Sequence, residues 1–158
     1  MSAVISDCGQ YRYVLERHIP SRFGWGRPCL FVMLNPSTAD AEQNDPTIRR
    51  CLSFAESWGA TKLTVVNLFA LRSTDPKKLL DHSDPVGPEN DDHIFDQISK
   101  HASGLKIAAW GASANAKERA FRVSMMTKWD SLGTTKDGSP RHPLYVKGDT
   151  SFKEWRLP

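Results

Sequence analysis

The segment that most constrains the fold is residues 29–40. It begins with six apolar residues, and this run ends abruptly in the polar stretch 35–38, which contains Asn35 and Ser37. The pattern predicts a buried strand that breaks into a polar loop, and helical spacing resumes at Pro46. In α/β proteins ligands bind at the carboxyl ends of strands, so residues 35–45 are the first place to look for a functional site.

Hydrophobic spacing divides the rest of the chain into strands and helices. Runs of β-branched and apolar residues predict four buried strands, at 30–34, 62–70, 105–110 and 129–133. Apolar residues at helical spacing predict three helices, at about 46–58, 88–102 and 113–126. The alternation over 10–17 is typical of an edge strand or a hairpin arm, and residues 72–87 are predicted to be a long loop with one helical turn.

Strands that alternate with helices predict an α/β fold of three layers. Helices would cover both faces of a small, mainly parallel central sheet. A chain of 158 residues fits a single domain over residues 1–158 and can bury a core without a disulfide or a metal staple.

Cysteine usage and the first residues bear on location and cofactors. Cys8, Cys29 and Cys51 are odd in number and form no C-x-x-C pair, which argues against a zinc or iron–sulfur site. The N-terminus has no signal-like apolar core, and no apolar run is long enough to cross a bilayer. We therefore expect a cytoplasmic protein without membrane contact, and no metal, organic cofactor or obligatory protein partner is implied.

The net charge of +3 is unevenly distributed along the chain. From Lys106 onward there are ten Lys and Arg residues and five Asp and Glu residues, whereas residues 1–104 carry eleven and thirteen. A positive last third is typical of a surface that binds a phosphate backbone, although a mildly basic solvated face is the commoner explanation.

Four polar groups follow the predicted strands or lie in the last loop. They are the stretch 35–38, Asn67, Trp110 with Gly111, and the loop 140–145. Because the carboxyl ends of parallel strands lie along one edge of a sheet, we expect these four groups to meet there.

The order of these motifs resembles that of the uracil-DNA glycosylase superfamily. Its members place an Asn-Pro or Asp-Pro motif after the first core strand, then an Asn at a strand end, a Trp-Gly segment and a late His-Pro loop. The matching residues here are 34–37, 65–68, 109–114 and 141–144. Over residues 11–147 the chain is also similar to a small bacterial and phage family without an assigned function, whose segments match residues 34–40, 45–47, 110–111 and 142–145.

The glycosylase resemblance implies excision of a base from DNA, with DNA as the partner. One nucleotide rotates out of the duplex into a pocket, and the bond between sugar and base is broken. The base leaves with negative charge, so the protein needs a positioned water and hydrogen-bond donors. By the resemblance Asn35 holds the water and His142 donates to the base. An amide cannot accept the water's proton, so Asp45 or Asp40 would assist.

Each of these residues also has a purely structural interpretation. Asn35 can shape the turn from strand to helix, and Asp45 can cap the helix that begins at Pro46. A lone loop histidine such as His142 is usually just solvated.

Further residues are candidates for contacts with the base and with DNA. Asn67 is placed to hydrogen-bond the edge of the flipped base, or alternatively the backbone of a loop. The other base-binding candidates are Ser37, Phe69, Trp110 and Trp25. The three aromatic residues among them also fit a role in the core. The candidates for phosphate contacts are Arg49, Arg50, Lys117, Arg119, Arg141 and Lys147. Leu144 or Tyr145 would enter the gap left by the flipped nucleotide, or pack on the core.

The chain departs from the glycosylase pattern in three places. Leu34 stands where members carry Gly, residues 37–38 differ from those that follow the first motif, and residues 144–145 replace Ser-Pro. These changes argue against ordinary uracil as the substrate, and the loop 72–87 is long enough to enclose a bulky or modified pyrimidine. Excision of modified phage bases in antiviral defence is a hypothesis that follows by analogy.

Two other classes of function stay open. One is a non-catalytic nucleic-acid or nucleotide-binding module, favoured by the missing Gly and the lack of an obvious base. The other is a hydrolase that uses Cys51 or Cys29. It is disfavoured because Cys51 falls on the apolar face of its helix and Cys29 begins a buried strand.

Overall fold

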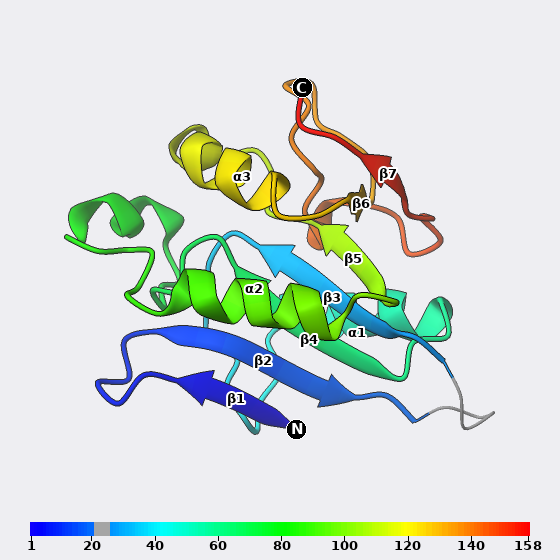
Figure 1. Ribbon diagram of the computed structural model, residues 1–158, viewed down its shortest axis with the longest axis horizontal. Coiled ribbons are helices and arrows are strands. Elements are labelled where there is room, and N and C mark those ends of the chain that lie inside the picture. Colours follow the sequence, from blue (N-terminus) through cyan, green and yellow to red (C-terminus); the bar gives the residue numbers. More distant parts are fainter. Residues whose placement is uncertain (21–25) are drawn as a thin grey trace.

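The computed structural model describes residues 1–20 and 26–158. Within these ranges seven strands form one sheet in the order β1-β2-β4-β3-β5-β6-β7 (Figure 1). The strands are β1 (Ser2–Ile5), β2 (Arg12–His18), β3 (Pro28–Met33), β4 (Lys62–Asn67), β5 (Leu105–Ala108), β6 (Trp129–Ser131) and β7 (Lys153–Trp155). The four strands β4, β3, β5 and β6 run parallel in the middle of the sheet.

The α/β class is confirmed, but the sheet is mixed rather than mainly parallel. Three of the six strand pairings among the described residues, β1 with β2, β2 with β4 and β6 with β7, are antiparallel. β2 is a hairpin arm, as one reading of the sequence expected. It is not an edge strand, because β1 pairs with its outer side after a short turn. The short strands β1 and β7 lie at the two edges and were not foreseen.

Three α-helices occur in the described part of the chain, near the predicted positions. They are α1 (Pro46–Ser57), α2 (Asn90–Lys100) and α3 (Lys117–Ser124). Three short 3-10 helices accompany them, η1 (Pro76–Asp81), η2 (Ala114–Ala116) and η3 (Pro143–Tyr145). No helix among these residues is both long and apolar enough to cross a membrane.

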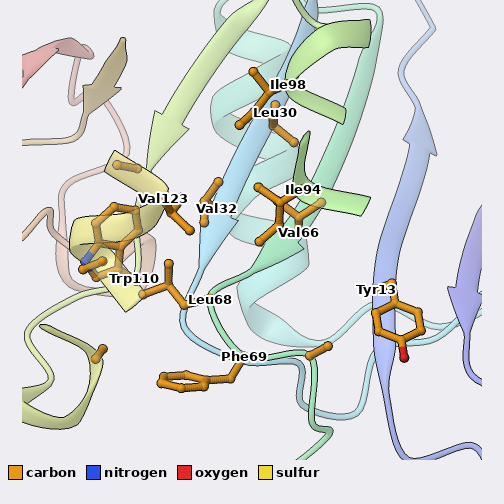
Figure 2. Packing of buried hydrophobic residues seen from close by; sticks show 14 of the residues in the cluster. Tyr13, Leu30, Val32, Val66, Leu68, Phe69, Ile94, Ile98, Trp110 and Val123 are labelled. Carbon is orange, nitrogen blue, oxygen red and sulfur yellow. The ribbon is translucent and has the colours of Figure 1, made fainter. Parts of the chain in front are cut away.

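Side chains of the central strands alternate between two core clusters. Leu30 and Val32 of β3 face α2 and α3, where they pack with Ile94 and Val123 (Figure 2). The intervening residues of β3, such as Phe31, face α1 on the other side of the sheet. The helices therefore cover both faces and leave the carboxyl ends of the strands as the place where loops from several elements meet.

Candidate functional site

A cavity of about 640 Å³ lies beside the carboxyl ends of β3, β4 and β5. Its size falls within the roughly 300–1,000 Å³ typical of small-molecule sites. Asn35, Asn67, Trp110 with Gly111, and His142 all line it, so the expected meeting of the four polar groups is confirmed. Ile48 near the start of α1 also contributes to the wall.

Asn67 is the last residue of β4 and pairs in register with Met33 of β3. Asn67 is only 1% exposed, and neither Nδ2 nor Oδ1 of its side chain has a hydrogen-bond partner in the described part of the chain. Buried polar atoms are nearly always bonded, and each one left unpaired costs about 1–3 kcal/mol. Asn67 therefore has an unpartnered donor and an unpartnered acceptor buried in the wall of the cavity.

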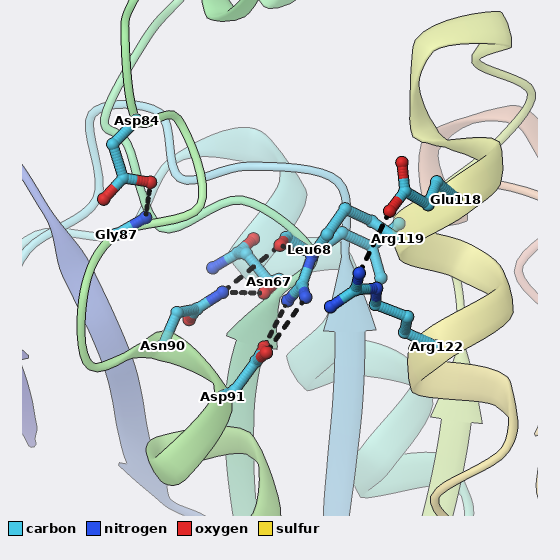
Figure 3. Close-up of polar contacts among 9 residues, drawn as sticks. All are labelled: Asn67, Leu68, Asp84, Gly87, Asn90, Asp91, Glu118, Arg119 and Arg122. Carbon is cyan, nitrogen blue, oxygen red and sulfur yellow. Dashed lines mark hydrogen bonds and ion pairs between the residues drawn. The ribbon is translucent and has the colours of Figure 1, made fainter.

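The main chain at Asn67 is held by two neighbouring helices (Figure 3). Asn90 Nδ2 donates to the oxygens of Asn67 and Leu68, at 3.0 and 3.2 Å. Arg119 Nε donates to the Leu68 oxygen at 3.1 Å, and its guanidinium forms an ion pair with Asp91 at 2.6 Å. These bonds fix the backbone and leave the Asn67 amide unengaged. Arg119 is buried, so the expectation that it contacts phosphate is wrong.

Asn35 is anchored through the donor side of its amide. Nδ2 donates to the main-chain oxygens of Ser73 at 2.8 Å and Pro36 at 3.0 Å. No residue in the described ranges donates to Oδ1, which is thus available as an acceptor. An oxygen in this state can receive a hydrogen bond from a water but cannot take its proton. Shaping the turn and facing the cavity are compatible roles for this residue.

The two candidate carboxylates differ in position. Asp45 is 9% exposed and lines the cavity, and its Oδ1 accepts a hydrogen bond of 2.8 Å from Ile48 N as the cap of α1. Asp40 is not among the lining residues. Its Oδ1 accepts from Glu42 N and Gln43 N, and these bonds lower the pKa of Asp40. Of the two carboxylates, only Asp45 is therefore placed to act in the cavity.

His142 precedes η3 and lines the cavity from the last loop. Its Nδ1 accepts a hydrogen bond of 3.3 Å from Leu144 N, which places the proton of a neutral ring on Nε2. Burial lowers the pKa of His142, while the negative charge of Asp45 acts in the opposite direction. The ring is therefore neutral at pH 7 and offers Nε2–H as a donor.

The remaining base-binding candidates have different surroundings. Ser37 and Trp110 line the cavity. Trp110 also belongs to the core cluster and packs edge-to-face on Trp155, with ring centroids 5.2 Å apart. Phe69 does not line the cavity, because it packs into the core on the α2 and α3 side of the sheet (Figure 2). The prediction that Phe69 contacts the base is corrected on this ground, and Trp25 lies outside the described residues.

Two of the residues expected at the DNA surface lie at the cavity itself. Arg141 and Tyr145 line it, and Tyr145 is 79% exposed. Leu144, which is 45% exposed, and Lys147 are on the same loop outside the lining. This loop therefore presents apolar and basic side chains beside the cavity.

The other cations expected to contact phosphate lie elsewhere. Arg50 bonds the main-chain oxygens of Pro143 and Val146, so it fastens the last loop to α1 and is not a free phosphate ligand. Arg49 is exposed and donates to the Asn44 oxygen. Lys117 borders a separate cavity of about 230 Å³.

Sequence reasoning missed several residues of the wall, above all Arg12. The other polar residues that it missed are Thr47, Ser73, Thr74 and Thr135. The alternation over 10–17 predicted an edge strand or a hairpin arm and gave Arg12 no role in a site, yet this residue is only 2% exposed and lines the cavity. A charged residue within an otherwise buried strand was the available signal.

The two cysteines considered as nucleophiles are both fully buried. Cys29 and Cys51 are each 0% exposed, and neither is among the residues that line the cavity. Burial raises the pKa of both thiols far above neutral pH, so neither forms the reactive thiolate. These findings argue against a cysteine hydrolase.

Fold and site together define an α/β protein with a ligand-sized cavity, lined by both polar and apolar side chains, at the carboxyl edge of its parallel strands. A family model described as "Protein of unknown function (DUF1643)" matches residues 12–144. The chain therefore belongs to this family, in agreement with the expected membership of a family without an assigned function. Comparison with curated proteins gave no match, and comparison with solved structures gave none either.

Proposed function

We propose that this protein is a DNA glycosylase that rotates a base into the cavity and hydrolyses the bond between base and sugar. The fold would then be a three-layer variant of the uracil-DNA glycosylase type. The observation that carries the proposal is the unpartnered amide of Asn67, in the wall of a cavity that Asn35, Asp45 and His142 also line. A cavity wall with an unbonded donor and acceptor fits a ligand that supplies both.

Base recognition falls to Asn67. The pairing edge of a pyrimidine presents a donor beside an acceptor, and a side-chain amide can bond both. Asn90 and Arg119 hold the main-chain oxygens of Asn67 and Leu68, so the backbone that carries the Asn67 amide is fixed before the base arrives. Such preorganisation avoids reorganisation when the ligand binds.

Hydrolysis uses the other three polar residues. Asn35 Oδ1 accepts a hydrogen bond from the attacking water, and the carboxylate of Asp45 accepts the water's proton. The water oxygen bonds to C1′ of the sugar as the bond to the base breaks and its electron pair leaves with the base. Nε2–H of His142 donates to the base as negative charge develops, and the released base then takes a proton from solvent.

Residues around the cavity provide contacts for DNA. Arg141 and Lys147 are on the last loop, and Lys77 and Lys78 follow the lining residue Pro76 at the start of η1. Exposed Leu144 and Tyr145 suit insertion into the gap left by the flipped nucleotide. A large cavity supports a bulky or modified pyrimidine, and removal of such bases from phage DNA is the biological role proposed here.

A second candidate is a binding module without catalysis. It is favoured by the observation that one oxygen of Asp45 is committed to the Ile48 N–H, which leaves a single oxygen for a proton. Such a module would bind a base in the same cavity and release no product.

One experiment separates these two functions. The protein is incubated with duplexes that carry uracil, mismatched thymine, hydroxymethylated cytosine or glucosylated cytosine, and alkali then cleaves any abasic site. The glycosylase proposal requires abasic product on at least one duplex, lost in Asn35→Ala with DNA binding retained. Thr38→Ala is the matched control, because Thr38 is an exposed residue of the same loop outside the cavity lining. Binding without product on every duplex supports the module.

A further inference from the structure

Arg12 begins β2 and is 2% exposed, yet it lines the cavity. Its Nη1 donates to the main-chain oxygen of Ala39 at 2.7 Å, and its Nε has no partner within the described ranges. No carboxylate of those ranges lies within the 4.0 Å of an ion pair with it. Arg12 is therefore a buried cation with unused donors beside an open volume.

Arg17 on the same strand provides a direct comparison. It is equally buried, at 2% exposure, but it does not line the cavity. Its Nε donates to Asn44 Oδ1 at 2.7 Å, and its Nη atoms donate to several main-chain oxygens. The guanidinium of Arg17 is thus engaged at Nε and at both Nη atoms, as in a structural arginine, whereas that of Arg12 makes a single hydrogen bond among the described residues, to Ala39 O. Of the two arginines, the one with unused donors is the one that lines the cavity.

The charge on Arg12 persists at neutral pH. Burial lowers its pKa to about 10, so the guanidinium stays protonated at pH 7. Asp45 and Asp40 stabilise the positive charge, whereas Arg72 and Arg17 oppose it. Burying a charge without a paired partner is costly, and a ligand that supplies negative oxygens would remove that cost.

We propose that Arg12 is the anion-recognising residue of the cavity, and that the substrate carries a carboxylate or a phosphate on the part that enters it. The planar guanidinium matches either group in a two-bond arrangement. The cavity volume of about 640 Å³ accommodates a base together with such a group. This inference rests on the proposed function, since it takes the cavity as the substrate site, and it narrows the substrate to an anionic one.

The test is calorimetric titration of the full chain with three free ligands. They are 5-carboxy-2′-deoxycytidine, 2′-deoxycytidine 5′-monophosphate and neutral 2′-deoxycytidine, so the first two distinguish a carboxylate on the base from a phosphate on the sugar. We expect one anionic ligand to bind at least tenfold more tightly than the neutral nucleoside. Equal affinity for all three, or no detectable binding of any, overturns the proposal.

Variants then assign the preference to Arg12. Arg12→Gln should remove the preference for the anionic ligand, Arg12→Lys should keep part of it, and Arg17→Gln should keep all of it. Thermal unfolding identifies any variant that fails to fold, and in that case the comparison of ligands on the unaltered protein decides. A preference that survives in folded Arg12→Gln overturns the proposal.

The outcome is separable from that of the glycosylase assay. Anion-dependent binding without abasic product on any duplex, including one that carries 5-carboxycytosine, leaves the role of Arg12 standing and removes the glycosylase. Abasic product from neutral bases, without a preference for anionic ligands, supports the glycosylase and overturns the role proposed for Arg12.

Discussion

The side-chain amide of Asn35 donates a hydrogen bond of 2.8 Å to the main-chain oxygen of Ser73. Ser73 N in turn donates to the oxygen of Pro36 at 2.9 Å, so the loop after β3 and the loop after β4 are joined by reciprocal bonds. Both loops border the cavity. The arrangement orients Asn35 with its donor group used and its acceptor free.

This orientation predicts the effect of Asn35→Ala. We expect the rate of base excision under single turnover to fall by about 100-fold or more, because positioning and activation of a nucleophile commonly contribute that much. The free energy of unfolding should also fall by about 1–2 kcal/mol, because the bonds to Ser73 and Pro36 are lost. Thr38→Ala should change neither quantity. A variant with unchanged rate and reduced stability would make Asn35 purely structural.

Replacing Asn67 by leucine should make the free protein more stable. Asn67→Leu removes two unpartnered buried polar atoms, so the Tm of the free protein should rise by about 2–4 °C while base binding is lost. Asn90→Leu is the contrast, because it deletes the bonds to the oxygens of Asn67 and Leu68 and should lower the Tm. If Asn67→Leu destabilises the protein as much as Asn90→Leu does, the amide of Asn67 has a structural rather than a ligand-binding role.

Stability should decrease in mild acid because of two histidines. Burial lowers the pKa of both His101 and His142, so the unfolded chain binds protons more readily than the folded one. Their contribution to stability is full above the unfolded value of about 6.5 and is lost as pH falls from there through the lower folded pKa. Urea unfolding at pH 7.5 and at pH 5 measures the loss.

The histidine variants test that assignment. His142→Gln and His101→Gln should each reduce the difference in stability between the two pH values, whereas the exposed His18→Gln should not. A pH dependence identical in all three variants would assign it to other groups.

Arg141 and Tyr145 should contribute to DNA binding in different ways. Arg141→Ala should weaken duplex affinity and reduce the slope of log Kd against log salt by about one, as expected for loss of one phosphate contact. Tyr145→Ala should weaken binding without changing that slope, because its contact is apolar. Arg156→Ala is the control, since Arg156 is an exposed cation beside β7 that pairs with Glu154. Equal effects of Arg141→Ala and Arg156→Ala would exclude a specific phosphate contact near the cavity.

Hydrophobic spacing and the alternation of strands with helices were enough to foresee the meeting of Asn35, Asn67 and His142. Residues of a buried parallel strand form a continuous apolar run, and polar residues that follow such runs lie at one edge of the sheet. The cap of α1 by Asp45 was likewise predictable from sequence, because Asp45 and the Ile48 N–H that it accepts from are only three residues apart.

The chain's own pattern did not reveal which strands lie at the edges, because β1 and β7 are short and pair with partners that only the fold brings alongside. Nor did it separate Arg12 from Arg17, or Arg50 from Arg141. All four are ordinary basic residues in sequence. Groups far along the chain engage Arg17 and Arg50 through two or more bonds each, whereas Nε of Arg12 has no partner in the described ranges. The amino-acid order thus determined the central strands, the helices and the edge of the sheet where the cavity lies, through local periodicity. Only the tertiary structure decided which polar atoms at that edge have partners, because those partners come from segments far apart in the chain.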